Sequence, residues 1–254
     1  YILFLVLFAL LIYAPLAHWT WHPDGFLFKW GVLDFAGGTV VHMSAGFAAL
    51  AASMYLRNKS EKKTAISPAN IPFVLLGTGL LWFGWFGFNA GSALTSGALA
   101  VSAFVSTQMA AAAAAVAWAV LEWISSRRPT ALGIISGAVA GLATVTAAAG
   151  YVTPMGAIGI GALTGIVCYV SVVIVKSKLG YDDSLDCFGI HGVGGILGVL
   201  LVGILATTTI NPAGANGLAY GGSRQLLIQF IAVLVTAAYS FALSFGLLKL
   251  VDKV

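Results

Sequence analysis

The sequence consists largely of apolar runs of about 20 residues separated by short polar breaks, and each run is long enough to cross the roughly 30 Å hydrocarbon core of a bilayer as a helix. A transmembrane β-barrel would instead alternate polar and apolar residues, which these runs do not do. Only 8% of the residues are charged, against about 25% in soluble proteins. The pattern excludes an ordinary soluble domain and predicts an all-α polytopic membrane protein.

Eight transmembrane helices can be placed on these runs. They cover residues 2–21, 36–56, 70–93, 97–124, 131–150, 155–176, 183–208 and 225–251. No linker, charge block or shift in composition divides the sequence, so residues 1–254 are predicted to form a single transmembrane domain. The chain starts inside an apolar run, with neither a Met nor a signal peptide, and we expect its natural N-terminus to be missing.

The basic residues gather at one end of this predicted bundle. Those that follow even-numbered helices are Arg57, Lys59, Lys62, Lys63, Arg127, Arg128, Lys176, Lys178, Lys249 and Lys253. Only Lys29 and Arg224 fall on the other side. The positive-inside rule therefore places the first group, and with it the C-terminus, in the cytoplasm.

Two histidines lie inside predicted helices at matching depths. His42 is eight residues after Asp34, and His191 is eight residues after Asp183. At 1.5 Å per residue, each histidine lies about 12 Å inside its helix, and the two helices enter the membrane from opposite sides. If these helices are neighbours, the two imidazoles can meet near the middle of the membrane.

A histidine in an apolar helix can be a core residue that is hydrogen-bonded to a neighbouring helix. Two at matching depth favour a functional role, because ionisable groups inside a membrane are costly and tend to line pathways. A neutral imidazole has one nitrogen that donates and one that accepts, so a pair can pass on a hydrogen bond and shuttle a proton.

The acidic and sulfur groups near these histidines are less specific. Asp34, Asp183 and Asp186 lie at helix N-termini, where a carboxylate can simply cap exposed N–H groups, and capping and function are equally favoured. Cys168 and Cys187 share no close-spaced metal motif and are predicted to be unpaired core residues. We expect no metal site and no cofactor.

Aromatic residues gather near the predicted external ends of the first and third helices. They are Trp19, Trp21, Trp82, Trp85 and Phe88, and Asn89 and Ser92 follow them. An aromatic belt at the membrane surface explains most membrane tryptophans. The alternative is that some of these ring faces attract a cation. Composition does not choose between the two.

Three segments together resemble signature segments of the ammonium transporter (Amt) family, bacterial type, in the same order and at similar spacing. They are DFAGGTVVH at 34–42, GWFGFNAGS at 84–92 and FGIHGVGG at 188–195. The resemblance implies a fold of eleven transmembrane helices in two inverted halves, of which the eight here would be the fourth to the eleventh. It also implies that the first three helices and the C-terminal tail lie outside this chain.

The resemblance also implies roles for individual residues. His42 and His191 match the twin histidines that line the pore and relay protons. Trp21 and Ser92 match the residues that recruit ammonium, and Phe88 matches one phenylalanine of the gate. The remaining match is Asp34, the acid beneath the vestibule. We also expect Trp85 and Asn89 to be possible pore-lining residues.

The function implied is a transporter and not an enzyme. Ammonium is attracted at the external mouth and loses its proton, and ammonia crosses an apolar pore along the two histidines. The resemblance further implies a homotrimer in the inner membrane with lipid around it, no nucleic-acid partner, and a PII-type regulatory protein on the cytoplasmic side. Two alternatives remain, namely an Amt-type sensor domain of a signalling protein and a bis-histidine haem membrane protein.

Overall fold

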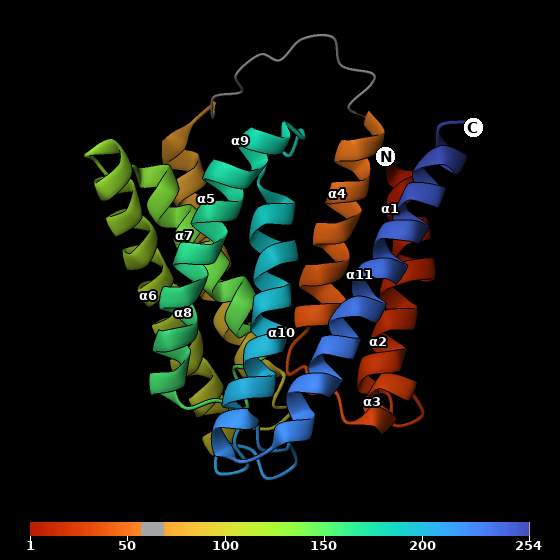
Figure 1. The fold of residues 1–254 in the computed structure, drawn as a ribbon, viewed down its shortest axis with the longest axis vertical. Coiled ribbons are helices and arrows are strands. Elements are labelled where there is room, and N and C mark those ends of the chain that lie inside the picture. Colours follow the sequence, from red (N-terminus) through yellow and green to blue (C-terminus); the bar gives the residue numbers. More distant parts are fainter. Residues whose placement is uncertain (57–68, 254) are drawn as a thin grey trace.

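The computed structural model describes residues 1–56 and 69–253, and every regular element within these ranges is a helix (Figure 1). Among the described residues, seven helical stretches are long and apolar enough to cross a membrane. A shorter apolar helix, α7, is the eighth. The prediction of an all-α polytopic membrane protein is confirmed. The basic residues between 57 and 63, on which part of the predicted orientation depends, lie outside the described residues.

Several of the membrane spans contain π-helical stretches, which carry the label η, as does one short 3₁₀ helix, η6. In chain order the elements are α1 (Ile2–Phe8), η1 (Ala9–Tyr13), α2 (Ala14–Trp21), α3 (Phe26–Trp30), η2 (Gly38–Met43), α4 (Ser44–Leu56), α5 (Ile71–Gly91), α6 (Ala98–Ser126), α7 (Ala131–Val145), α8 (Pro154–Tyr169), η4 (Val170–Val175), α9 (Lys176–Leu179), η5 (Phe188–Gly192), α10 (Val193–Leu205), η6 (Leu218–Tyr220) and α11 (Ser223–Val251). Wider π-turns inside α-helices are frequent at functional sites, and here η2 and η5 contain His42 and His191.

The helix predicted over 131–150 ends at Val145, five residues early. The backbone carbonyls of Thr146 and Ala147 accept hydrogen bonds from the N–H groups of Ala36 and Phe35, both at 3.1 Å. These carbonyls therefore bind a distant segment instead of continuing the helical ladder. The apolar residues that follow are fully buried in a turn, which apolar content cannot distinguish from a helix.

The helix predicted over 183–208 also differs, since η5 begins only at Phe188 and α10 ends at Leu205. Its first predicted turn is not helical, because the Asp183 carboxylate accepts the N–H groups of Cys187 and Phe188. This cap places the start of the helix after Asp183 in the sequence. The other predicted helices agree with the observed ones to within about three residues, the usual error of such boundaries.

The helices run roughly side by side, with α4 and α10 in the middle of the bundle (Figure 1). On one side of this central pair α6 packs against α7 and α8, while on the other α11 crosses at an angle and packs against both α4 and α10. The C-terminus and α9 lie at one end of the bundle, and α3 lies at the opposite end. The arrangement brings two distant segments, η2–α4 and η5–α10, into contact at the centre.

The central contact depends on two glycines. A Cβ atom on Gly46 of α4 would overlap with the backbone nitrogen and Cα of Gly192 in η5. The two helix backbones therefore touch at this point, one helical turn beyond His42 and directly beside His191. Close approach through small residues is the usual way for membrane helices to associate, because lipid removes the hydrophobic drive.

Candidate functional site

The Asp34 side chain organises the start of the segment that carries His42. Its Oδ1 accepts the N–H groups of Gly37 and Gly38 at 2.9 and 2.6 Å, and its Oδ2 accepts the N–H group of Thr39 at 2.8 Å and the Thr39 hydroxyl. The carboxylate is only 4% exposed. It therefore satisfies N–H groups that a helix start would otherwise leave unpaired inside the protein.

Asp183 does the same for the segment that carries His191. Its two carboxylate oxygens accept the N–H groups of Cys187 and Phe188 at 2.9 and 2.8 Å. Each of the two histidines thus lies eight residues beyond a buried carboxylate that caps its helix. Asp186, the third acid, instead accepts a hydrogen bond from Lys176 at 2.5 Å and does not cap this helix start.

The two histidines are in direct contact. The Nδ1 atoms of His42 and His191 are 3.1 Å apart, and the rings are stacked with their centroids separated by 5.2 Å. His42 is 3% exposed, and its Nε2 has no hydrogen-bond partner among the described residues. Each ring therefore has one nitrogen engaged with the other ring and one nitrogen left over.

Aromatic rings hold His42 in place. Trp85 of α5 stacks on the His42 ring with a centroid separation of 5.4 Å and an angle of 11° between the planes. Phe88 meets the same imidazole edge-on at 6.3 Å. The Trp85 indole N–H donates to the Thr146 hydroxyl at 2.9 Å, so its orientation is set by the turn after α7.

A groove of about 640 Å³ runs along this side of the histidine pair. It is lined by His42, His191, Trp85 and Phe88 together with Val41, Ala45, Gly77, Leu80, Leu81, Gly84 and Cys187. Among these lining residues none is an acid, a lysine or an arginine. The groove therefore presents an apolar wall along which the only ionisable groups are two imidazoles and one thiol.

Groups beside the site but outside the membrane spans stay neutral. Burial, followed by the charge of Asp183, raises the pKa of the Cys187 thiol to about 11. Burial and the charge of Asp34 raise the pKa of Tyr151 to about 12. Neither the Cys187 thiol nor the Tyr151 hydroxyl is therefore an anion near neutral pH.

The model of the Ammonium Transporter Family matches residues 1–254, which is the whole chain. The chain belongs to the ammonium transporter family.

Similarity to individual family members extends over nearly the whole chain. The chain is 48% identical over 252 residues to an ammonium transporter of Bacillus subtilis, and the match covers 99% of this chain and 62% of that protein. It superposes on the crystal structure of Saccharomyces cerevisiae Mep2 with a TM-score of 0.92 at 35% identity, over 99% of this chain and 58% of that one. A structure titled "Sensor Amt Protein" gives a TM-score of 0.85 at 36% identity, over 95% and 62% of the two chains. The chain spans about 60% of the length of these family members.

The other residues predicted for an Amt-type mouth are Trp21 and Ser92. They lie where α2 and α5 end, at the end of the bundle opposite the chain's C-terminus. Trp21 is 38% exposed, and its indole N–H donates to the backbone carbonyl of Asp34 at 2.8 Å. The Ser92 hydroxyl donates to the Phe88 carbonyl at 2.9 Å. These contacts connect Trp21 to the Asp34 segment and Ser92 to the Phe88 segment, while Phe88 itself contacts His42.

Of the two residues predicted as possible pore lining, Trp85 lines the groove and Asn89 does not. Asn89 is fully buried, and its side-chain amide donates to the Thr107 hydroxyl of α6 at 3.0 Å. Residues four apart on a helix are offset by about 40°, so Trp85 and Asn89 can face different neighbouring segments. Trp85 faces His42, and Asn89 faces α6. Asn89 connects α5 to α6.

The sequence reasoning missed two parts of this Amt-type site. Thr146, which holds Trp85, lies in a stretch predicted to be helix, and no sequence signal pointed to it. The close approach of Gly46 and Gly192 was also missed as a contact, although both glycines follow the histidines closely. The equal spacing of Asp34 from His42 and of Asp183 from His191 was the available signal for two matching caps.

Replacing Asp34 with asparagine is expected to lower the free energy of unfolding by about 3 kcal/mol, because the amide NH₂ would face buried N–H donors and leave them without an acceptor. Denaturation of the full-length protein in detergent measures the change. The matched control is Asp24→Asn, which alters an exposed ion pair with Lys29 and should have little effect. Equal stability of the two variants would contradict the capping role.

Proposed function

We propose that the protein of which this chain is a part transports ammonium across a membrane, with His42 and His191 as the pore-lining proton relay. The observation that carries the proposal is the direct 3.1 Å contact of two buried imidazoles beside an apolar groove, in a chain of the ammonium transporter family. An imidazole pair can accept a proton at one nitrogen and donate one at another, which a purely structural pair would not need to do.

The apolar wall supports the passage of neutral ammonia and not of the ammonium ion. Moving an unpaired charge into hydrocarbon costs several kcal/mol on any insertion scale, and none of the groove-lining residues carries a carboxylate that would offset this cost. Ammonium can pass its proton to the proposed imidazole relay and cross as ammonia. Potassium is similar in size but has no proton to lose, so deprotonation would also provide selectivity.

The mouth would attract the ion before it is deprotonated. A partly exposed indole such as Trp21 offers a face that attracts cations, and a hydroxyl such as Ser92 offers an acceptor oxygen. Phe88 would then form part of the gate between this mouth and His42, which it contacts. Asp34 would have a structural role at the start of the His42 segment, since both of its oxygens are engaged in the capping contacts.

A second candidate function is ammonium sensing. The similarity to the structure titled "Sensor Amt Protein" favours it, because the two chains share 36% identity over 95% of this one. A sensor would bind ammonium at the same residues and signal through a further domain of the full-length protein. A bis-histidine haem protein is not supported, because the two imidazoles are in direct contact at 3.1 Å and leave no space between them for a haem.

The family also suggests how the protein is assembled and placed. We propose a homotrimer in the inner membrane, with the C-terminus in the cytoplasm and a PII-type regulatory partner on that side. The basic residues described at the cytoplasmic end, Arg127, Arg128, Lys176, Lys178, Lys249 and Lys253, support this orientation.

The test is to reconstitute the full-length protein in liposomes and to apply pulses of ammonium and of potassium at equal concentration. A transporter is expected to give a current, or a change in internal pH, with ammonium and none with potassium. Calorimetric binding of ammonium with no transport of either kind would support the sensor instead. The absence of both binding and transport would overturn the two functions together.

A further inference from the structure

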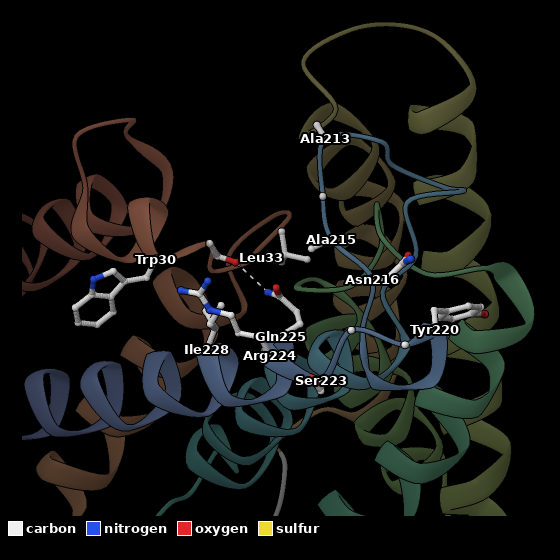
Figure 2. Close-up of a pocket in the computed structure, with 14 residues that line it drawn as sticks. Trp30, Leu33, Ala213, Ala215, Asn216, Tyr220, Ser223, Arg224, Gln225 and Ile228 are labelled. Carbon is white, nitrogen blue, oxygen red and sulfur yellow. Dashed lines mark hydrogen bonds between the residues drawn. The ribbon is translucent and has the colours of Figure 1, made fainter.

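A cavity of about 630 Å³ lies away from the histidine pair, at the end of the bundle where α3 ends and α11 begins (Figure 2). Its wall is formed by Trp30, by the loop that leads into α11, and by the first turns of α11 itself. Tyr220, Ser223, Arg224 and Gln225 are among the lining residues. The mechanism proposed above uses none of these groups.

Arg224 carries a positive charge that the described part of the chain does not neutralise. It forms no ion pair there, and no acidic side chain lines the cavity. The neighbouring Gln225 is engaged, because its amide donates to the Gly31 carbonyl at 2.9 Å. Figure 2 shows the Arg224 side chain between Trp30 and Gln225 in that view, with its guanidinium directed away from Tyr220. An exposed guanidinium with five N–H donors therefore faces a hollow that offers it no acceptor group of opposite charge.

A second, apolar groove of about 310 Å³ continues from the same residues along α11. Trp30, Arg224 and Ile228 line both spaces, and Leu227 and Ile231 complete the groove. Ile231 is seven residues beyond Arg224, about 10 Å further into the membrane span. Leu227 is 59% exposed, so this groove opens toward the lipid side of the helix.

We propose that the cavity and the groove together bind one anionic phospholipid. Its phosphate binds the Arg224 guanidinium, with which phosphate forms strong paired hydrogen bonds, and one acyl chain lies along Leu227, Ile228 and Ile231. A zwitterionic headgroup would bring a cation next to Arg224 without any carboxylate in the cavity to receive it. The order of a charged end and an apolar groove matches the order of headgroup and chain in a lipid.

A plain interfacial Arg and Trp pair is the simpler explanation of the two side chains. Such a pair stays hydrated at the membrane surface and needs no hollow between its members and the neighbouring loop. The cavity next to Arg224 and the groove that leads away from it are the features that the simpler explanation does not account for.

The test uses the full-length protein in detergent and measures the binding of phosphatidylglycerol by native mass spectrometry. Wild type is expected to retain lipid that Arg224→Gln binds about tenfold more weakly, as expected when one charge-assisted hydrogen bond is lost. Leu227→Asn is expected to weaken binding as well, through the acyl chain. Arg128→Gln removes the same charge from an exposed residue at the opposite end of the bundle, and should bind like wild type.

The melting temperature of each variant without lipid shows that it is folded. Phosphatidylcholine is expected to bind more weakly than phosphatidylglycerol, and glycerol 3-phosphate, which has no acyl chains, is expected not to compete. Equal binding by Arg224→Gln and Arg128→Gln would overturn the proposal. Full competition by glycerol 3-phosphate would identify a soluble-phosphate site instead, and a lack of any Arg224-dependent lipid would show that another part of the protein covers this surface.

Discussion

The full-length protein with His42→Ala is expected to lose about a hundredfold or more of its ammonium transport, the scale typical of a lost proton-transfer group. Alanine removes the nitrogen that contacts His191 at 3.1 Å and also empties the space between Trp85 and the groove. The contact between the two imidazoles, along which the proposed relay would pass a proton, would then be lost. Ammonium-induced current in liposomes measures the effect.

His18 provides a matched control for this substitution. It lies in α2 near the same end of the bundle as Trp21, is exposed, and stacks on His22 rather than on a residue that lines the groove. His18→Ala is therefore expected to leave transport unchanged. A third variant, His42→Gln, keeps a side chain that forms hydrogen bonds but cannot carry a proton at neutral pH. If folded His42→Ala protein transports ammonium at the wild-type rate, the relay role is wrong.

A single methyl group at Gly46 is expected to have a large effect through packing alone. Gly46→Ala would drive a Cβ atom into the backbone of Gly192, so α4 and η5 would have to separate. Overpacking of this kind costs about 1–3 kcal/mol in well-packed interiors. Because Gly192 is next to His191, the separation would also lengthen the contact between the two imidazoles. We expect a lower melting temperature together with a strong loss of transport.

The control for Gly46→Ala is Gly79→Ala in α5, where an added Cβ would meet nothing within 4 Å. Alanine is a better helix former than glycine by about 1 kcal/mol, so this variant should be as stable as wild type or more stable. If the two alanine variants behaved alike, the close approach of α4 and η5 would not be what holds the histidine pair together.

The sequence predicted the fold class well because membrane helices follow from local composition. A run of apolar residues has few alternatives inside a bilayer, where each backbone polar group must be paired within its own segment. The failures lie at Val145 and Phe188, where backbone groups pair with a distant segment or with an aspartate side chain. Apolar content does not report such partners, so it overextended both helices.

The candidate site was predictable to the extent that depth could be counted. His42 and His191 were placed at the same level by their spacing from Asp34 and Asp183, and the structure brings the two rings together. The direction of a side chain around its helix was not predictable in the same way. Trp85 and Asn89 lie one turn apart on α5, yet one stacks on His42 and the other binds Thr107 of α6, because the neighbouring helices decide which face is which.

The contact between the two Nδ1 atoms gives the histidine pair a polarity. Only one of two neutral rings can carry its proton at the shared position, so the other ring must carry its proton on Nε2. At any moment the two outer Nε2 atoms of the pair are therefore one bare nitrogen and one N–H. Passing a proton along the pair exchanges these two states, and the same passage cannot be repeated in the same direction until both rings have reset. The pair would therefore pass one proton at a time, and both rings would have to return to their starting protonation between successive ammonium ions.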